Sequence, residues 1–408
     1  MARVLFLAHR IPYPPNKGDK IRSWHELRHL AARHEVHLGA FVDDPDDWQH
    51  EAVLRDICAD VHLVGIHPRA ARLKSLRSLF SGEPLSLGYY RSPEMGDWVR
   101  GRFAAGIDRV FLFSSPMAQF IPLDEGRPAR LVMDFVDIDS DKWRQYARLH
   151  KPPMAWVYGR EARTLAAYER QVARRADACL FVSEREAELF RAMAPESGGR
   201  VHGLNNGVDH GFFTPDLLFD NPMGEGPNLV FTGAMDYWAN AEAVTWFARE
   251  VLPLIRARQP GAQFVIVGGK PTPAVQALGG IEGVTVTGRV PDVRPYIAHA
   301  DLVVAPLRVA RGVQNKVLEG MAMARPVVTT PQGAEGIACL PGRELWVAEG
   351  RTGFAEACLE ALTSEDRPAV MTRARARVLK SYDWAGNLAA LESFLDIDDG
   401  PPAAARAC

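Results

Sequence analysis

The residues whose types and spacing best suit chemistry lie in the segment 301–337, where a short apolar run leads into a loop rich in cations. Arg308, Arg311 and Lys316 crowd this loop and the first turn of a helix that we predict to start near Gln314. The unpaired N–H groups of a helix N-terminus, with a dipole worth about half a positive charge, attract anions. Cations are unfavourable there unless an anion accompanies them. The pattern therefore predicts a diphosphate-binding site.

Glu319 follows Lys316 by three residues, so the two side chains share one face of the predicted helix. A carboxylate at this position can accept hydrogen bonds from two ribose hydroxyls. The alternative is an ion pair with Lys316. Val317, Leu318 and Met321 are predicted to fill the buried face of the same helix.

Short apolar runs alternate with segments of helical spacing along the chain, which is typical of parallel sheets covered by helices on both faces. The runs span 3–8, 36–42, 109–113, 130–134 and 178–182 in the first half, and 228–232, 263–267, 284–287, 302–305 and 326–329 in the second. In such sheets ligands bind beyond the carboxyl ends of the strands.

We predict an α/β fold with two Rossmann-like, doubly wound parallel-sheet domains that face a cleft. Turn residues near Asn206 separate the domains, residues 1–205 and 206–381. An amphipathic helix at about 382–398 is expected to pack back on the first domain.

Composition excludes several classes of protein. With 408 residues, of which 47% are hydrophobic, the chain is long enough for two cores. The 48 basic and 50 acidic residues nearly cancel, which gives no sign of a nucleic-acid partner. Five cysteines without a CxxC pair suit a reducing compartment. The apolar run after Met1 is too short for a signal peptide, and no run approaches the about 18 residues of a membrane span, so we expect a cytoplasmic protein.

An acidic cluster follows the predicted strand 130–134. It consists of Asp134, Asp137, Asp139 and Asp141 in MDFVDIDSDKW. DID and DSD match the DxD pattern of metal-dependent transferases of a different fold, but two acids one residue apart arise easily by chance. We therefore expect no metal ion.

Two further segments have a functional and a structural interpretation. In the loop PYPPNKGD after the first strand, the backbone of Gly18 could approach a phosphate, and the alternative is an ordinary strand-to-helix connection. Between Pro68 and Pro84, four cations interleave with apolar residues. They are Arg69, Arg72, Lys74 and Arg77, with Leu73, Leu76, Leu79 and Phe80. A basic amphipathic helix can lie on an anionic membrane, and the alternative is that its apolar side packs on the core.

The segment 301–337 resembles the donor-binding segment of glycosyltransferase family 4, the retaining GT-B enzymes. It most resembles the subgroup associated with bacterial exopolysaccharide export and PEP-CTERM sorting. The resemblance extends over nearly the whole chain, through HRIPYPPNKGDKIRSW, DFVDIDSDKW, FVSEREAELF, NNGVD, FTGAMDYWAN and the helix of Lys316 and Glu319. Only the last motif is specific by itself, and the order of all of them makes the resemblance strong.

The resemblance implies retaining transfer of a hexosyl group from a nucleotide-diphosphate sugar to a saccharide or polyprenyl-linked acceptor. It is also compatible with peripheral association of the protein with the inner face of the plasma membrane. The nucleotide sugar is a substrate, and no cofactor is implied. The donor-binding positions, which include the cations of the loop, are Gly18, Gly233, Arg289, Val290, Arg308, Gly312, Asn315, Lys316 and Glu319.

Asp137 lies where the family commonly has a histidine close to the transferred sugar. A carboxylate there could bind a sugar hydroxyl or stabilise an oxocarbenium-like transition state. We therefore assign catalytic roles to Asp137, Arg311, Lys316 and Glu319.

Two features depart from the family pattern. Arg311 replaces the first of two glutamates eight positions apart, and AMDYWAN lacks the usual Arg and Lys after the FxG strand. We hypothesise that Arg308, Arg311 and Lys316 supply the missing positive charge.

Two other functions remain as alternatives. A nucleotide-sugar epimerase of GT-B architecture would also bind a diphosphate, and a non-catalytic nucleotide-sugar-binding subunit would explain the departures from the family pattern. A dinucleotide-dependent oxidoreductase is poorly supported, because no GxGxxG follows the first strand.

Overall fold

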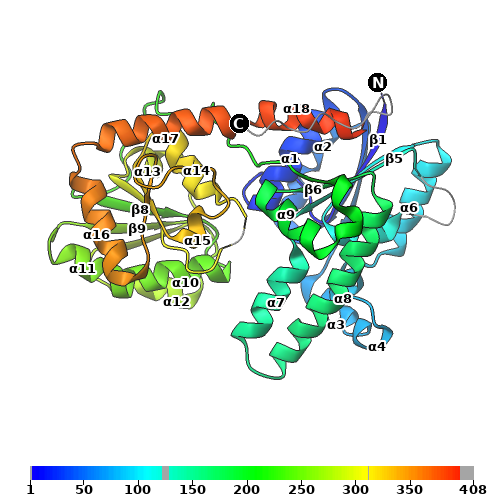
Figure 1. Ribbon diagram of the computed structural model, residues 1–408, viewed down its shortest axis with the longest axis horizontal. Coiled ribbons are helices and arrows are strands. Elements are labelled where there is room, and N and C mark those ends of the chain that lie inside the picture. The colour runs from blue at the N-terminus through cyan, green and yellow to red at the C-terminus, as the bar shows by residue number, and fades with distance from the viewer. Residues whose placement is uncertain (1, 122–127, 311, 396–408) are drawn as a thin grey trace. The chain divides into compact units, whose positions relative to one another are not determined.

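A computed structural model describes residues 2–121, 128–310 and 312–395. The chain divides into two compact units: the first runs to Asn205 and resumes at Ala385, and the second is Asn206–Trp384. Each unit is built on one parallel sheet with helices on its faces (Figure 1). The predicted fold class, two doubly wound α/β domains, is therefore confirmed. From the resemblance we expect residues 1–205 to bind the acceptor and residues 206–381 to bind the donor, and this stays a prediction.

The first unit has a seven-stranded parallel sheet in the order β3-β2-β1-β4-β5-β6-β7. Its strands are β1 (Arg3–Ala8), β2 (Glu35–Val42), β3 (Asp60–Gly65), β4 (Arg109–Phe113), β5 (Arg130–Val136), β6 (Ala178–Phe181) and β7 (Val201–Gly203). Its α-helices are α1 (Gly18–Ala31), α2 (Glu51–Arg55), α3 (Pro68–Ser75), α4 (Ser78–Ser81), α5 (Leu85–Tyr90), α6 (Pro93–Ala104), α7 (Asp139–Leu149), α8 (Met154–Arg175), α9 (Glu184–Met193) and α18 (Trp384–Leu395).

The second unit has a six-stranded parallel sheet in the order β10-β9-β8-β11-β12-β13. Its strands are β8 (Asn228–Thr232), β9 (Gln263–Val267), β10 (Val284–Gly288), β11 (Leu302–Ala305), β12 (Val327–Thr329) and β13 (Trp346–Val347). Its α-helices are α10 (Trp238–Trp246), α11 (Leu252–Arg256), α12 (Pro273–Gln276), α13 (Arg294–Ala298), α14 (Asn315–Ala322), α15 (Pro331–Ala334), α16 (Gly350–Thr363) and α17 (Arg367–Ser381).

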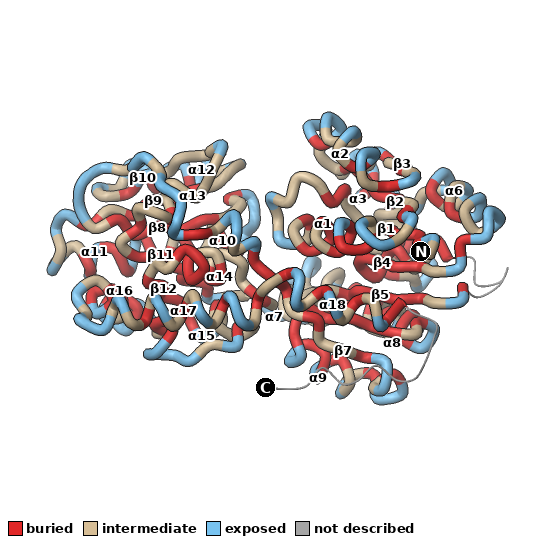
Figure 2. The backbone as a smooth tube through the Cα atoms, turned by 90° about the horizontal axis from the view of Figure 1, so that it is seen from above, coloured by how far each residue is buried: buried red, intermediate tan, exposed pale blue. Residues whose placement is uncertain are grey.

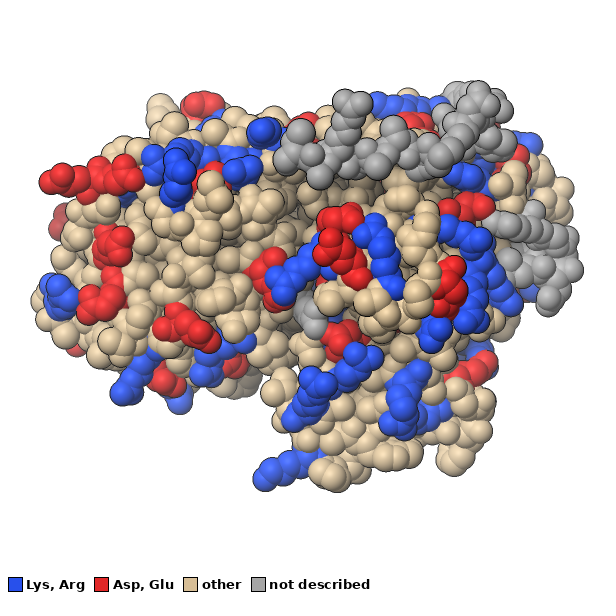
Figure 3. All heavy atoms as spheres, in the orientation of Figure 1, with Lys and Arg blue, Asp and Glu red and all other residues tan. Residues whose placement is uncertain are grey.

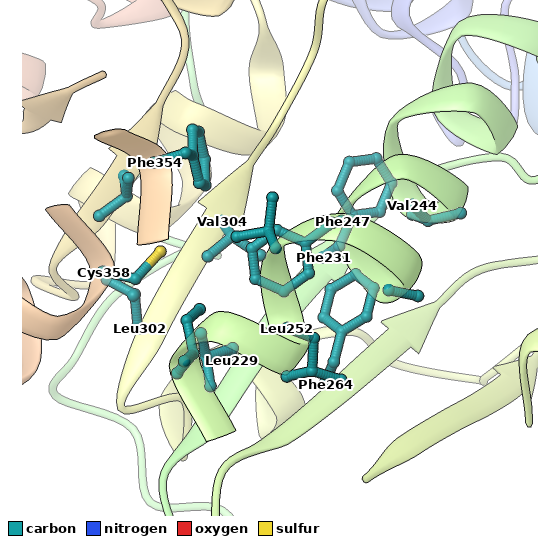
Figure 4. Close-up of a cluster of buried hydrophobic side chains, with 14 of the residues drawn as sticks. Leu229, Phe231, Val244, Phe247, Leu252, Phe264, Leu302, Val304, Phe354 and Cys358 are labelled. Atoms are coloured by element: carbon teal, nitrogen blue, oxygen red, sulfur yellow. The ribbon is translucent and has the colours of Figure 1, made fainter. Parts of the chain in front are cut away.

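The core of the second unit is aromatic and aliphatic. Phe231 on β8 and Phe264 on β9 point into a cluster with Phe247, whose ring centroid lies 4.5 Å from that of Phe264 (Figure 4). The central strands of both sheets are buried along most of their length (Figure 2). Full burial of a side chain of this size contributes roughly 1.5–3 kcal/mol. This packing fixes the ends of the strands, from which the loops of the candidate site begin.

The predicted C-terminal helix is α18. The guanidinium groups of Arg109 and Arg130, at the starts of β4 and β5, donate from Nε to the carbonyl oxygens of Leu395 and Phe394, at 3.1 and 2.7 Å. Cations at a helix C-terminus complement its dipole. The helix is thereby held on the first unit, and the predicted residues 396–398 lie outside the described residues.

Each sheet has one point at which the strand order reverses, between β1 and β4 in the first unit and between β8 and β11 in the second. Helices leave opposite faces of the sheet there, so the loops diverge and expose backbone N–H groups to a ligand. The loop that precedes Gly18 follows β1. The loops that carry Gly233 and Arg308 follow β8 and β11.

Two glycines let the backbone loops after β8 and β9 approach each other. Gly233 N donates to Val267 O at 3.0 Å, and Met235 N donates to Gly269 O at 2.9 Å. A Cβ atom on Gly268 would lie 1.7 Å from the carbonyl oxygen of Gly233. The shape of the loop after β8 therefore depends on glycine at position 268.

We predict that Gly268→Ala destabilises the second unit by more than about 2 kcal/mol, because the added methyl group collides with backbone and cannot be relieved by a rotamer change. Gly279→Ala is the matched control, since a Cβ there meets no atom within 4 Å. Urea unfolding of both variants tests this. Equal midpoints for the two variants would contradict the close backbone approach.

Candidate functional site

The candidate donor site is built around the N-terminus of α14. Gly312, with φ of 64°, turns the chain in the loop after β11, and Gln314 is the residue directly before the helix. Val317, Leu318 and Met321 are fully buried, as predicted, and anchor the helix on the sheet. This leaves Asn315, Lys316 and Glu319 on the half-buried face.

The amino group of Lys316 has few partners. Its Nζ lies 3.4 Å from Asn240 Oδ1 and 5.3 Å above the ring of Phe231. Burial lowers the pKa of Lys316 from 10.5 to about 8, although the charge of Glu319 acts in the opposite direction. A desolvated ammonium in this position would gain from an anion that replaces its lost water.

Burial also shifts the pKa of Glu319 in the direction that favours its neutral form. Burial raises the pKa of its carboxyl group from 4.5 to about 7, and the charge of Lys316 opposes this shift. The alternative interpretation, an ion pair between Lys316 and Glu319, is not formed among the described residues. Both groups therefore face the site without neutralising each other at hydrogen-bond distance.

Asn240 is a site residue that the sequence did not reveal. It lies in the first turn of α10, donates from Nδ2 to Ala234 O at 2.9 Å and accepts from Lys316 through Oδ1. A Cβ on Gly233 would lie 2.8 Å from the same amide nitrogen. Asn240 thus connects the loop after β8 with the helix of Lys316. An asparagine in the first turn of a mostly apolar helix was the available signal.

Arg308 does not offer a free charge. Its Nε donates to Glu242 Oε1 at 2.8 Å, and its guanidinium lies 5.3 Å from the ring centroid of Trp246. The hypothesis that Arg308 supplies positive charge to a diphosphate therefore needs this ion pair to open. Arg311 lies outside the described residues.

The remaining donor positions lie around the same sheet edge. Arg289 and Val290 directly follow β10, which is two strands away from β8 in the sheet order. Asn315 has an Oδ1 that is buried and without a hydrogen-bond partner among the described residues. An orphaned acceptor beside Lys316 is expected where a ligand donor belongs.

In the first unit, Asp137 follows β5 across a strained residue, Val136, whose φ is +68°. Oδ2 of Asp137 lies 2.8 Å from Lys142 Nζ, which also pairs with Asp139 at 3.1 Å. Oδ1 of Asp137 is buried without a partner in the described part of the chain. The two carboxylates hold the pKa of Lys142 well above its usual value.

Of the predicted acidic cluster, Asp137 and Asp139 share Lys142 as their partner, and the other two residues have partners of their own. Asp134 lies within β5, which extends to Val136, and its buried Oδ2 is 2.6 Å from Arg22 Nε. Asp141 pairs with Arg144 at 3.0 Å. Across residues 2–121, 128–310 and 312–395, no group of three or more His, Cys, Asp or Glu side chains is arranged to hold a metal ion.

Two polar networks in the first unit were missed from the sequence. Arg22 on α1 binds Asp134 and also donates from Nη1 to Leu204 O at 2.7 Å, so it joins α1, β5 and the last residues of the unit. Arg10, which follows β1, pairs with Asp19 and Asp43 at 2.5 and 2.9 Å. Polar residues placed directly after buried strands were the signal for the second network.

The loop with Gly18 is braced by these contacts. Gly18 starts α1, and a Cβ at this position would meet no atom within 4 Å. The backbone there is therefore open to a ligand, which is compatible with phosphate contact and equally with an ordinary connection.

We predict that Lys316→Met stabilises the free protein at pH 7 by about 1–2 kcal/mol, because a desolvated charge is replaced by an apolar side chain of similar size. The pKa of Lys316 is lower in the folded state, about 8, than its ordinary 10.5. The free-energy cost of burying the charged amino group is thus fully present below pH 8 and decreases as the pH rises to 10.5. Thermal unfolding of wild type and variant at pH 7 and near pH 10.5 measures this difference in stability.

Lys380→Met, on the exposed surface of α17, is the matched control and should show no pH-dependent gain. A loss of stability in Lys316→Met at pH 7 would mean that the amino group is already satisfied in the free protein.

Comparisons with known proteins find a family match in the second unit and similar folds for the whole chain. Residues 226–364 match the family model of Glycosyl transferases group 1. A GDP-mannose-dependent alpha-(1-6)-phosphatidylinositol monomannoside mannosyltransferase of Mycobacterium tuberculosis is 28% identical over 278 residues, which are 63% of this chain and 70% of that protein.

Solved structures of the same fold cover both units. HepE from Anabaena, in complex with UDP, has a TM-score of 0.68 at 14% identity and covers 97% of this chain and 99% of its own. Sucrose-phosphate synthase from Thermosynechococcus elongatus has a TM-score of 0.68 at 15% identity, with 96% and 98% covered. The chain therefore has the GT-B fold and carries, at residues 226–364, a glycosyl transferases group 1 domain, the two features of a GT-B glycosyltransferase.

Proposed function

We propose that the protein is a retaining hexosyltransferase of family 4 that moves a sugar from a nucleotide-diphosphate donor to a saccharide or lipid-linked saccharide acceptor. The observation that carries this proposal is the half-buried, poorly partnered Lys316 on the first turn of α14. An anion of the size of a diphosphate satisfies both the ammonium and the helix N-terminus. Glu319, three residues further along the helix, is then placed to accept hydrogen bonds from ribose hydroxyls.

In the proposed reaction, the bond between the anomeric carbon and the diphosphate oxygen breaks, and the acceptor hydroxyl oxygen bonds to that carbon on the same face. The proton of the acceptor passes to a phosphate oxygen of the leaving diphosphate. Lys316 neutralises the charge that develops on this leaving group. The carboxylate of Asp137 stabilises positive charge at the sugar ring, and the ion pair with Lys142 fixes its orientation.

The proposed donor is a nucleoside diphosphate sugar with either guanine or uracil as its base. The mycobacterial relative is named as GDP-mannose-dependent, and HepE was solved with UDP. Arg289 and Val290, after β10, are the positions proposed to lie at the edge of the base. No additional cofactor is part of the proposal.

The proposed acceptor is a polyprenyl-linked saccharide in the synthesis of a bacterial exopolysaccharide, reached by peripheral association with the inner face of the plasma membrane. The described part of the chain contains no helix that is long and apolar enough to cross a membrane. In this proposal the enzyme meets its lipid-linked acceptor at the surface of the bilayer.

Thermal unfolding in the presence of UDP or GDP tests the donor site. At about a hundred times its dissociation constant, a nucleotide should stabilise the folded protein by roughly 2.7 kcal/mol. We expect this for one of the two nucleotides in the wild type, and a much smaller effect in Lys316→Met. Stabilisation by neither nucleotide, or the same stabilisation in the variant, would contradict the placement of the diphosphate.

Product analysis with a labelled nucleotide sugar distinguishes the proposed activity from its alternatives. Release of free nucleotide that requires an acceptor is the outcome expected for transfer. A new sugar isomer would identify an epimerase, and binding without turnover would identify a non-catalytic subunit.

A further inference from the structure

The basic segment after β3 exposes its apolar residues instead of burying them. It forms two short helices, α3 and α4, in which Leu73 is 70% and Phe80 is 93% exposed. Leu76 is also exposed, and the buried positions of these helices are the small residues Ala71, Ser75 and Ser78. Of the two interpretations of this segment, the one in which its apolar side packs on the core does not hold for Leu73, Leu76 and Phe80.

The tip between α7 and α8 exposes a second apolar group. Leu149 at the end of α7 and Trp156 in the first turn of α8 are each 60% exposed, and Met154 between them is exposed as well. Isolated exposed apolar residues are common, but several large ones gathered on one lobe indicate a binding surface.

Buried polar contacts hold these two groups together. Arg160 on α8 donates to Ser78 O at 2.5 Å and to Glu83 O at 3.2 Å, on either side of Phe80 in the sequence. Trp156 lies one helical turn before Arg160 on the same side of α8. Glu161 accepts from Leu85 N at 2.6 Å. Phe80 and Trp156 therefore belong to one rigid lobe, in which α3, α4, α7 and α8 project together (Figure 1).

The exposed part of the lobe is positively charged. Its segments 68–82 and 142–160 contain no acidic residue, and Asp139 and Asp141 at the start of α7 are paired with Lys142 and Arg144. Its exposed cations, none of which forms an ion pair within the described residues, are Arg69, Arg72, Lys74, Arg77, Arg148 and Lys151. On the face in view in Figure 3, the projecting lobe shows mainly Lys and Arg atoms among uncharged ones.

We propose that this lobe is a docking surface for an anionic lipid bilayer. The docking surface consists of Leu73, Leu76, Phe80, Leu149, Met154 and Trp156 with the six cations named above. Its apolar side chains enter the boundary between headgroups and acyl chains while the cations bind lipid phosphates. This proposal names the residues that would carry the membrane association of the proposed function. It rests on the proposed function only for the reason why the protein would dock on a membrane.

The composition of the docking surface favours a bilayer over a protein partner. Cations alternate with apolar residues along α3, so both kinds of side chain meet the same plane, as in interfacial helices. Tryptophan at the boundary is typical of membrane interfaces. A protein interface would instead carry an apolar centre with charges confined to its rim.

Sedimentation of the full chain with vesicles tests the proposal. Wild type should bind vesicles of phosphatidylcholine with phosphatidylglycerol, bind phosphatidylcholine alone at least about tenfold more weakly, and lose affinity as salt rises. Phe80→Ser with Trp156→Ser should weaken binding to the anionic vesicles by about tenfold or more. Arg72→Gln with Arg77→Gln should do the same.

Matched controls come from the second unit, with Leu218→Ser and Leu340→Ser for the apolar pair, and Arg249→Gln and Arg351→Gln for the cations. These controls should bind as wild type does. Weak binding of wild type to anionic vesicles, or equal binding by the docking-surface variants, would overturn the proposal.

Nucleotide stabilisation measured on the same proteins separates this proposal from the proposed function. If wild type is stabilised by a nucleotide but does not bind anionic vesicles, only the docking surface is overturned. If it binds the vesicles but is not stabilised by a nucleotide, only the donor site is overturned.

Discussion

A desolvated ammonium group on the first turn of α14 is the constraint around which the second unit is organised. Lys316 lies above Phe231, a residue of the sheet core, and has a long hydrogen bond of 3.4 Å to Asn240. Its pKa of about 8 expresses the cost of this burial. A fold selected only for stability would place an apolar residue there. An anion bound at this site would interact favourably with the ammonium group and offset the cost of its burial.

The topology explains why this helix and not another carries the site. The strand order of the second sheet reverses between β8 and β11, so the loops that follow these two strands flank one position. Gly268 allows the loop after β8 to pass close to the backbone after β9, and Asn240 connects that loop to Lys316. The apolar core fixes the positions of these loops and of α14. The polar contacts then orient the side chains that face the ligand.

Strands with a strong apolar pattern were predictable from the sequence, and weaker ones were not. Runs such as 228–232 and 263–267 coincide with β8 and β9 because their residues are buried on both faces. The strand β3 was missed because half-buried positions, including His62, interrupt its apolar pattern. The strand β13 has only two residues, too few to show any periodicity.

The candidate site was predictable where it depends on a local motif. Lys316 and Glu319 lie on the face of the helix that their spacing implied, and this spacing is a property of the helix itself. The partners of distant residues were not predictable, since Glu242 neutralises Arg308 and Arg22 removes Asp134 from the acidic cluster. The exposure of Phe80 could not be decided from the sequence for a related reason, because an amphipathic pattern does not say whether its apolar side meets the core or a bilayer.

Proton uptake on nucleotide binding tests the central claim most directly. Titration calorimetry at about pH 8.5, in buffers of different ionisation enthalpy, measures protons taken up when UDP or GDP binds. The account predicts that wild type takes up a large fraction of one proton, because an anion beside Lys316 raises a pKa that starts at about 8. Lys316→Arg, which stays charged, should bind without uptake. Equal uptake in the two proteins would show that the diphosphate does not bind at Lys316.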